Sequence, residues 1–142
     1  FIGLPLIFTP FAWWQILIGY FVMHAVASMI MGSVFQMAHI MEDLDEPLPN
    51  EKGEIHNQYF VHQLVTTADF GRKNGLFSWY VGGLNYQVEH HLFPHISHIH
   101  YPELSVIVEN TAKEYDQPYH CKKSALAAWR SHLRRLKSLG RS

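Results

Sequence analysis

Apolar residues dominate the first forty positions of the chain, and their pattern predicts a membrane helix. Residues 1–10 are apolar but are interrupted by Pro5 and Pro10, which suits the end of one membrane helix followed by a tight turn. Residues 11–40 contain neither a charged residue nor a proline. Because about 20 such residues are enough to cross a bilayer, we expect this segment to span the membrane. A buried helix of a soluble core is the alternative, which a chain of 142 residues could not easily cover on all sides.

Beyond residue 41 the order of polar and apolar positions predicts a surface loop and then shorter helices. The loop, 42–54, combines six carboxylates with prolines and a glycine, and it lacks the spacing of an EF-hand calcium site. A turn is expected at 71–75. Helices are expected over 57–70, 76–93, 101–115 and 125–139. No strand pattern of any length is found, so the chain is predicted to be all-α.

Charge is distributed unevenly along the chain, although the formal net charge is only -1. Residues 1–41 carry no Lys, Arg, Asp or Glu, whereas residues 42–54 carry six acids. Residues 121–142 hold seven of the eleven Lys and Arg residues and no acid. This order is typical of a membrane protein with a basic cytoplasmic tail rather than of a soluble globule.

The last expected helix, 125–139, is basic and amphipathic. Its apolar members are expected to pack inward or to touch lipid: Ala127, Trp129, Leu133 and Leu136. Its basic members are expected to face water or anionic head groups: Arg130, Arg134, Arg135 and Lys137. Because this segment has little aromatic interleaving and follows a membrane helix, no nucleic-acid partner is predicted.

The single cysteine indicates the redox compartment, and the first residue indicates whether the chain is a complete protein. Cys121 alone excludes an internal disulfide and fits a reducing compartment. The chain begins with Phe1, and no positively charged segment precedes its apolar run. We therefore expect the C-terminal part of a longer protein. Residues 1–142 are expected to belong to one domain, with a membrane helix region over 1–41 and a cytoplasmic helical region over 42–142.

A glutamine and two adjacent histidines form the most distinctive polar cluster. Within a helix, Gln87 lies three residues before His90 and four before His91, so the three side chains share one face. Converging neutral imidazoles are good ligands for iron or zinc. A histidine-rich helix end on a solvated surface is the alternative. Pro94 is expected to end this helix, because proline lacks an N–H group.

Further histidines lie before and after this cluster. At the end of the apolar helix, Gln36 and His39 share a face and could reach past the bilayer. His24 lies about 22 Å earlier along the helix, so it cannot share a metal with His39 and is expected to be a hydrogen-bonded histidine within the membrane. The histidines in the loop-like run after Pro94 are not expected to be ligands: His95, His98 and His100.

Three segments resemble the membrane fatty acid desaturases. The run QVEHHLFP (87–94), preceded by WYxGxLNY (79–86), is similar to the third histidine box of the front-end branch, in which glutamine replaces the first histidine of the box. The run QMAHIME (36–42) is similar to the segment that carries an isolated ligand histidine in that family. The segment with Gln63, Thr67 and Asp69 is similar to the one that precedes the third box.

The resemblance implies a non-haem centre with two iron ions, ligated almost entirely by histidine. It makes His39, His90 and His91 iron ligands, and it places Gln87 at a ligand position as a weaker donor that acts directly or through water. Asn85 and Asp69 would hold the outer nitrogens of ligating imidazoles. The remaining candidates would orient ligands or line the substrate path: Gln63, Thr67 and Gln36.

The resemblance also implies a reaction and its partners. A fatty acyl chain bound to CoA or to a lipid would gain a cis double bond in an O2-dependent reaction, on the cytoplasmic side of the membrane. Electrons would come from a ferredoxin or a cytochrome b type donor. A related lipid hydroxylase, a sphingolipid desaturase and a non-catalytic remnant that binds one zinc are the alternatives. The first two histidine boxes of the family are absent from this chain, so it is expected to be inactive by itself.

Overall fold

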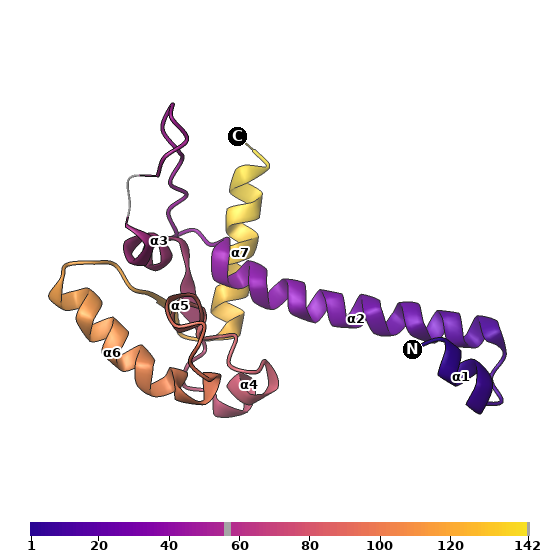
Figure 1. Ribbon diagram of the computed structural model, residues 1–142. Helices are drawn as coiled ribbons and strands as arrows, with labels where there is room; N and C mark the ends of the chain where they lie inside the picture. The colour runs from indigo at the N-terminus through magenta and orange to yellow at the C-terminus, as the bar shows by residue number, and fades with distance from the viewer. Residues whose placement is uncertain (56–57, 142) are drawn as a thin grey trace. The chain divides into compact units, whose positions relative to one another are not determined.

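A computed structural model describes residues 1–55 and 58–141, of which most are helical (Figure 1). Helices account for 61% of the residues and strands for 4%, so the predicted helical class is confirmed. The chain divides into two compact units, residues 1–33 and residues 34–142. The long helix α2 (Trp13–His39) begins in the first unit and contributes its last six residues to the second.

The first unit contains a short helix, α1 (Gly3–Phe8), and most of α2. The 27 residues of α2 make it long and apolar enough to cross a membrane, as the uncharged run predicted. Its apolar side chains are almost all exposed among the described residues. His24 is exposed, and its Nδ1 lies 2.9 Å from the carbonyl oxygen of Tyr20 one turn earlier.

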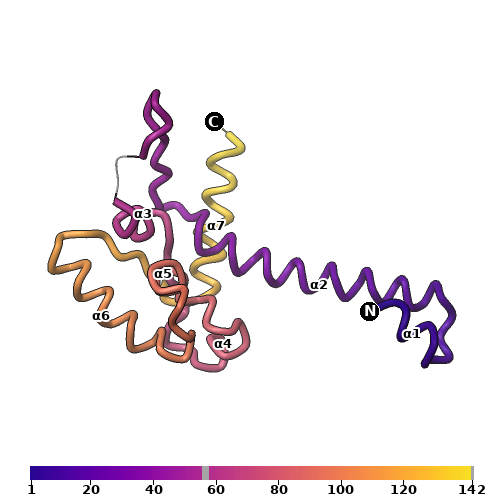
Figure 2. The backbone as a smooth tube through the Cα atoms, in the orientation of Figure 1, coloured from indigo at the N-terminus to yellow at the C-terminus, as the bar shows by residue number. Residues whose placement is uncertain are grey.

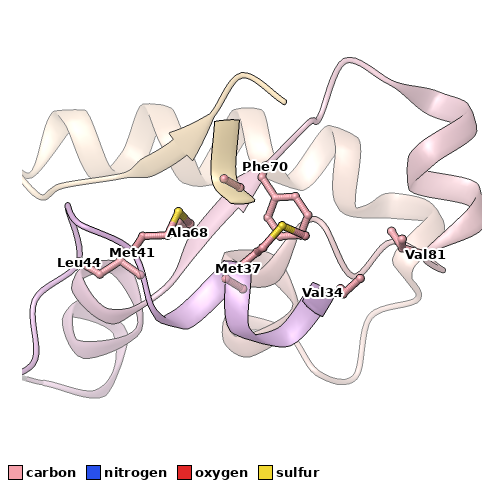
Figure 3. Packing of buried hydrophobic residues seen from close by; sticks show 9 residues of the cluster. Val34, Met37, Met41, Leu44, Ala68, Phe70 and Val81 are labelled. Carbon is pink, nitrogen blue, oxygen red and sulfur yellow. The ribbon is translucent and has the colours of Figure 1, made fainter. Parts of the chain in front are cut away.

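The core of the second unit forms around the end of α2 (Figure 3). Val34, Met37, Ala38 and Met41 are buried, and their spacing places them on one face of the helix and its extension. They pack against Phe70, which is fully buried. Burying a side chain of this size stabilises a fold by about 1.5–3 kcal/mol, so this cluster fixes the last turns of α2 within the second unit.

Two short strands contradict the prediction that the chain has no strand. β1 (Ala68–Phe70) and β2 (His120–Lys122) pair in parallel, with Ala68 opposite His120. Each has three residues, which is too short to show the alternation that identifies a strand in a sequence. The expected helix over 57–70 is accordingly shorter: α3 spans Tyr59–Thr66 and gives way to β1, while residue 57 lies outside the described residues.

The prediction of a single helix over 76–93 was also wrong, because the structure has two helices in this segment. α4 spans Gly75–Tyr80 and α5 spans Gln87–Leu92, with a turn between them. Gly82 and Gly83 have φ values of 61° and 76°, a left-handed conformation that a helix cannot continue through. α5 ends at Leu92, as expected from Pro94. The histidine pair therefore lies on a separate helix of six residues.

The remaining helices agree with their predicted limits. α6 spans Tyr101–Glu114, after a 3-10 turn at His98–His100, and α7 spans Ala125–Leu139. α5 contacts both α3 and α6, and the three helices lie side by side in the backbone trace (Figure 2). The predicted acidic loop is confirmed, and within it Asn50 Oδ1 accepts hydrogen bonds from the backbone N–H groups of Lys52 and Glu54.

Small and polar residues form the face of α7 that packs onto the fold. Its buried residues are Ala128, Ser131 and His132, and His132 Nδ1 lies 2.9 Å from the carbonyl oxygen of Ile40. Two of its basic residues form surface ion pairs with the acidic loop: Arg134 with Glu42 and Arg135 with Glu46. Of the apolar side chains expected to pack inward or to touch lipid, Trp129, Leu133 and Leu136 are exposed and Ala127 is half-buried.

Candidate metal centre

Two histidines from distant parts of the sequence meet in the second unit. His39 is the last residue of α2, and His91 lies on α5. Their Nε2 atoms are 3.2 Å apart, and the ring planes are inclined by 86°. Two imidazole nitrogens bound to one ion at about 2.1 Å, with about 100° between the bonds, lie about 3.2 Å apart. The pair therefore fits two neighbouring ligand positions around one metal ion.

The protonation of His91 suits such a role. Burial, together with the neighbouring His39 and His90, lowers the pKa of His91 to about 4. The imidazole is therefore neutral near pH 7, and a neutral imidazole protonated at Nδ1 presents the Nε2 lone pair to a metal.

Gln87 adds an oxygen donor beside this pair. It is the first residue of α5, it is fully buried, and its side chain lies beside the His39 ring. Gln87 Nε2 donates a hydrogen bond to the carbonyl oxygen of Leu84 at 2.7 Å. Its Oε1 is buried without a hydrogen-bond partner among the described residues. Because a buried acceptor without a partner costs about 1–3 kcal/mol, this oxygen is suited to bind a metal or a metal-bound water.

His90 is oriented differently from His91. Its Nδ1 lies 3.4 Å from the hydroxyl of Tyr101, and its ring centroid is 5.7 Å from that of His91. Because the contact with Tyr101 involves Nδ1, the lone pair of His90 Nε2 is available to a metal ion. Tyr101, which is buried, was not identified from the sequence, where it is simply the first residue of an amphipathic helix.

The described residues do not form a complete metal site. Within residues 1–55 and 58–141, no group of three or more His, Cys, Asp and Glu side chains converges in the way a metal ion requires. The donors that this chain offers are the His39–His91 pair, the Gln87 oxygen and the neighbouring His90. An ion held here would need further ligands.

A buried polar cluster fixes α5 to β1 beneath these donors. The Val88 N–H group donates to Asp69 Oδ1 at 3.0 Å, and the Tyr119 hydroxyl lies 2.7 Å from Asp69 Oδ2. The same hydroxyl lies 2.9 Å from Glu89 Oε1. Arg72 Nη1 donates to the Tyr119 oxygen at 3.2 Å. This cluster anchors the helix that carries the histidines, and sequence reasoning found only Asp69 among its members.

The two carboxyl groups of this cluster are fully buried, which determines their protonation. One Tyr119 hydroxyl has one hydrogen and cannot donate to both Asp69 and Glu89. Burial and the neighbouring Asp69 raise the pKa of Glu89 to about 9, so Glu89 is protonated near pH 7. Its proton supplies the second hydrogen of the cluster. Burial raises the pKa of Asp69 as well.

The other residues predicted to support the site lie as follows. Asn85 is fully buried, and its Nδ2 donates to the carbonyl oxygen of Phe70 and to the Ser78 hydroxyl, at 3.1 and 3.0 Å. These bonds tie α4 to β1 and involve no histidine. Thr67 is buried, Gln63 is half-buried and Gln36 is exposed. His95, His98 and His100 are exposed.

An apolar pocket of about 410 Å³ lies between α3, α5 and α6. Its wall includes Leu92, which directly follows His91, and Phe60, Leu64, Val108 and Tyr115. Gln63 and Thr67, which were expected to line a substrate path, do not line this pocket. A cavity of this size and lining suits an apolar ligand.

Comparison with known proteins assigns these features to a family. The family model for fatty acid desaturase matches residues 1–123. The acyl-lipid (8-3)-desaturase of Mortierella alpina is 38% identical over 96% of this chain and 30% of its own length. The sn-1 linoleoyl-lipid 6-desaturase of Synechocystis is 36% identical over 99% of this chain and 39% of its own length. An acyl-lipid (8-3)-desaturase of Physcomitrium patens is 38% identical over 81% of this chain and 24% of its own length.

The chain thus spans about a third of the length of these relatives. No solved structure matches it.

Proposed function

The chain belongs to the fatty acid desaturase family, and on that premise we propose that the protein containing it introduces a cis double bond into a fatty acyl chain. The acyl chain is carried by CoA or by a lipid, and the relatives named acyl-lipid and linoleoyl-lipid desaturases favour the lipid-bound case. The substrate loses two hydrogens from adjacent methylenes, and O2 is reduced to two waters with these hydrogens, two electrons from a donor protein and two protons from solvent.

The observation that carries this proposal is the 3.2 Å approach of His39 Nε2 to His91 Nε2. These residues come from the two segments that resemble ligand-bearing segments of the family, and the fold brings them together across 52 positions of the sequence. Without an ion the same 3.2 Å suits an N–H···N hydrogen bond between the two neutral imidazoles, and with an ion both Nε2 atoms can serve as ligands.

Two iron ions are the proposed cofactor, and the residues present fit part of their coordination. His39, His90 and His91 are the proposed histidine ligands, and Gln87 Oε1 is the proposed weaker donor. Iron, when bound, supplies the activation of O2, because an unactivated C–H bond has no acidity that a general base could use. Ligands beyond these come from parts of the protein outside this chain.

The chain's own residues orient these donors. The cluster of Asp69, Glu89 and Tyr119 holds α5 against β1, so that the histidine side chains project from a fixed backbone. Tyr101 holds Nδ1 of His90, which leaves Nε2 for the metal. A hydrogen bond to the imidazole nitrogen that does not bind the metal fixes the orientation of the ring, which a site with several ligands requires.

The apolar pocket beside α5 supports an acyl substrate. Its wall reaches Leu92, one residue from His91, and it excludes charged groups. The proposed location of the enzyme is in a membrane that α2 crosses, with the active site on the cytoplasmic side. A ferredoxin or a cytochrome b type protein is the proposed electron donor.

Product analysis of the complete protein tests this proposal. A host that expresses it is fed linoleate-type precursors, and its acyl chains are examined by gas chromatography–mass spectrometry. We expect a new acyl species with one more double bond, which disappears when His91 is replaced by alanine. Hydroxylated acyl chains would indicate a lipid hydroxylase instead, and unsaturated long-chain bases would indicate a sphingolipid desaturase.

Metal analysis of the purified protein is the second test of the proposed function. Two irons per complete protein support the proposal. One zinc and no new lipid product would contradict it and would favour a non-catalytic metal-binding protein, because neutral imidazoles bind both metals.

A further inference from the structure

The C-terminal helix α7 has an exposed apolar stripe that the fold does not use. Its four members lie within about 80° of one another around the helix, at 100° per residue, and are 36–58% exposed: Leu126, Trp129, Leu133 and Leu136. The buried face of α7, formed by Ala128, Ser131 and His132, points in a different direction. The stripe therefore remains available after α7 has packed onto the second unit.

Basic residues flank this stripe on its solvent side. Arg130 and Lys137 lie within the next 40° around the helix, and they take part in no ion pair among residues 1–55 and 58–141. No acidic residue occurs after Asp116. A helix with an apolar stripe of tryptophan and leucine beside a row of Lys and Arg is suited to lie in the plane of a membrane, where the long basic side chains reach the phosphates.

A basic hollow adjoins the C-terminal end of α7. It has a volume of about 500 Å³ and is lined by Glu42, Arg134, Lys137, Ser138 and Arg141. Glu42 pairs with Arg134 at 3.3 Å, which leaves two cations facing the hollow without an opposite charge. The hollow therefore has a net positive lining that suits an anionic head group.

Contacts within the second unit tie α7 to the residues that directly follow α2. His132 Nδ1 lies 2.9 Å from the carbonyl oxygen of Ile40, directly after α2, and the Glu42 N–H group donates to the Ser131 hydroxyl at 3.3 Å. At about 1.5 Å per residue, the 27 residues of α2 are about 40 Å long. A bilayer with a hydrocarbon core of about 30 Å is about 40–45 Å thick with its head groups. α2 is therefore long enough to reach from one head-group level to the other, and α7 contacts the residues directly after it in the sequence.

We infer that α7 is an interfacial helix that rests on an anionic phospholipid surface of the membrane that α2 crosses. Leu126, Trp129, Leu133 and Leu136 enter the boundary between head groups and acyl chains, while Arg130 and Lys137 bind lipid phosphates. The inference requires α2 to span the bilayer, and it does not depend on desaturation. It holds or fails separately from the proposed reaction.

Lipid quenching of a label on α7 tests the inference in the complete protein. Leu133→Cys is labelled with an environment-sensitive fluorophore after Cys121 and any other reactive cysteines are replaced by serine. The protein is placed in nanodiscs of phosphatidylcholine, with or without phosphatidylserine, that carry bromine near the top of the acyl chains. We expect a blue-shifted emission that brominated lipid quenches, and more quenching when phosphatidylserine is present. Leu48→Cys, at an 86% exposed leucine of the acidic loop, is the matched control and should stay unquenched.

Charge removal gives an independent readout. Replacing Arg130 or Lys137 by glutamine should lower the ratio of docked to undocked α7 about fivefold per residue in anionic nanodiscs. Lys73→Gln, which removes an exposed cation from the turn before α4, should leave that ratio unchanged.

Two results would overturn the inference. A label at position 133 that stays as accessible to water as the one at position 48 would show that α7 does not touch lipid. A label that is shielded from water but not quenched by brominated lipid would show that another part of the protein covers the stripe.

Discussion

The Nε2 atoms of His39 and His91 lie 3.2 Å apart, although His39 ends the apolar helix α2 and His91 lies on a six-residue helix 52 positions later. Neither residue reaches the other by local geometry. The contact depends on the packing of α2 against β1 and on the buried cluster that holds α5 to β1. It therefore connects the long apolar helix of the chain to its candidate metal centre.

Replacing His91 by alanine should remove iron from the complete protein and abolish its product. The loss of activity should exceed the roughly 100-fold effect of removing a residue that only supports a ligand. Iron content and acyl products are the measurements. His95→Ala, at an exposed histidine four residues later, is the control and should keep both. Full iron content in the His91 variant would contradict its role as a ligand.

Replacing Tyr119 by phenylalanine should destabilise the protein, because it removes the hydroxyl that lies 2.7 Å from Asp69 Oδ2 and 2.9 Å from Glu89 Oε1. Leaving buried carboxyl oxygens without a hydrogen-bond partner costs about 1–3 kcal/mol. The thermal unfolding midpoint of the detergent-solubilised protein measures the effect. Tyr115→Phe, at a tyrosine that is 69% exposed, should leave that midpoint unchanged. Equal midpoints for the two variants would show that the Tyr119 hydroxyl contributes nothing.

Much of the helical framework could be predicted from the sequence, because its signals are local. The uncharged run and the interval of 3.6 residues between apolar positions define α2 and α6. The limits of α7 are equally local: the Ser124 side chain accepts a hydrogen bond from the Ala127 N–H group, as an N-cap residue does. In contrast, the sequence left open whether the large apolar residues of α7 pack inward or touch lipid, and in the structure small and polar residues form the packed face.

The candidate site was predictable only in part, because some of its contacts join positions that are far apart in the sequence. His90, His91 and Gln87 stand close together in the sequence, but the approach of His39 was expected from family resemblance rather than from spacing. Tyr119 is the clearest omission. It lies 50 positions from Asp69 and 30 from Glu89, and a tyrosine next to a short strand carries no local sign of such partners. The division between α4 and α5 was missed although Gly82 and Gly83 marked it.

The ion pairs of Glu109 predict how stability changes with pH. Glu109 accepts hydrogen bonds from Lys113 at 2.9 Å and from Arg72 at 2.6 Å, and these two cations lower the pKa of Glu109. Its carboxylate therefore stabilises the fold above the unfolded-state pKa of about 4.3, and this contribution is lost as the pH falls below that value. Glu109→Gln should cost about 1 kcal/mol at pH 7, since both pairs are partly exposed.

Unfolding midpoints measured between pH 7 and pH 3 check this prediction. The difference between the parent protein and Glu109→Gln should shrink as the pH falls. Glu114→Gln, at an exposed carboxylate of the same helix without an ion pair among the described residues, should give no such trend. A difference that is constant over the whole range would mean that the ionised carboxylate is not what stabilises this contact.

The turn between α4 and α5 offers a matched pair of glycine substitutions. Gly82 and Gly83 both have positive φ, so alanine at either position should cost about 1–2 kcal/mol from backbone strain. At Gly82 a Cβ atom would meet nothing within 4 Å. At Gly83 it would lie 2.7 Å from the Cβ atom of His98, which is too close for two carbon atoms and cannot be relieved by a side-chain rotation.

Gly83→Ala should therefore destabilise the protein more than Gly82→Ala, by about a further 1–3 kcal/mol for the overpacked contact. Because Gly83 directly precedes the segment that leads into α5, relief of the clash should also displace the histidine pair and lower the iron content. Thermal unfolding and iron analysis of the two variants measure these effects side by side. If both variants unfold at the same temperature and bind equal iron, the close approach of Gly83 to His98 does not constrain the turn. If Gly83→Ala alone loses iron, this turn sets the position of the histidines.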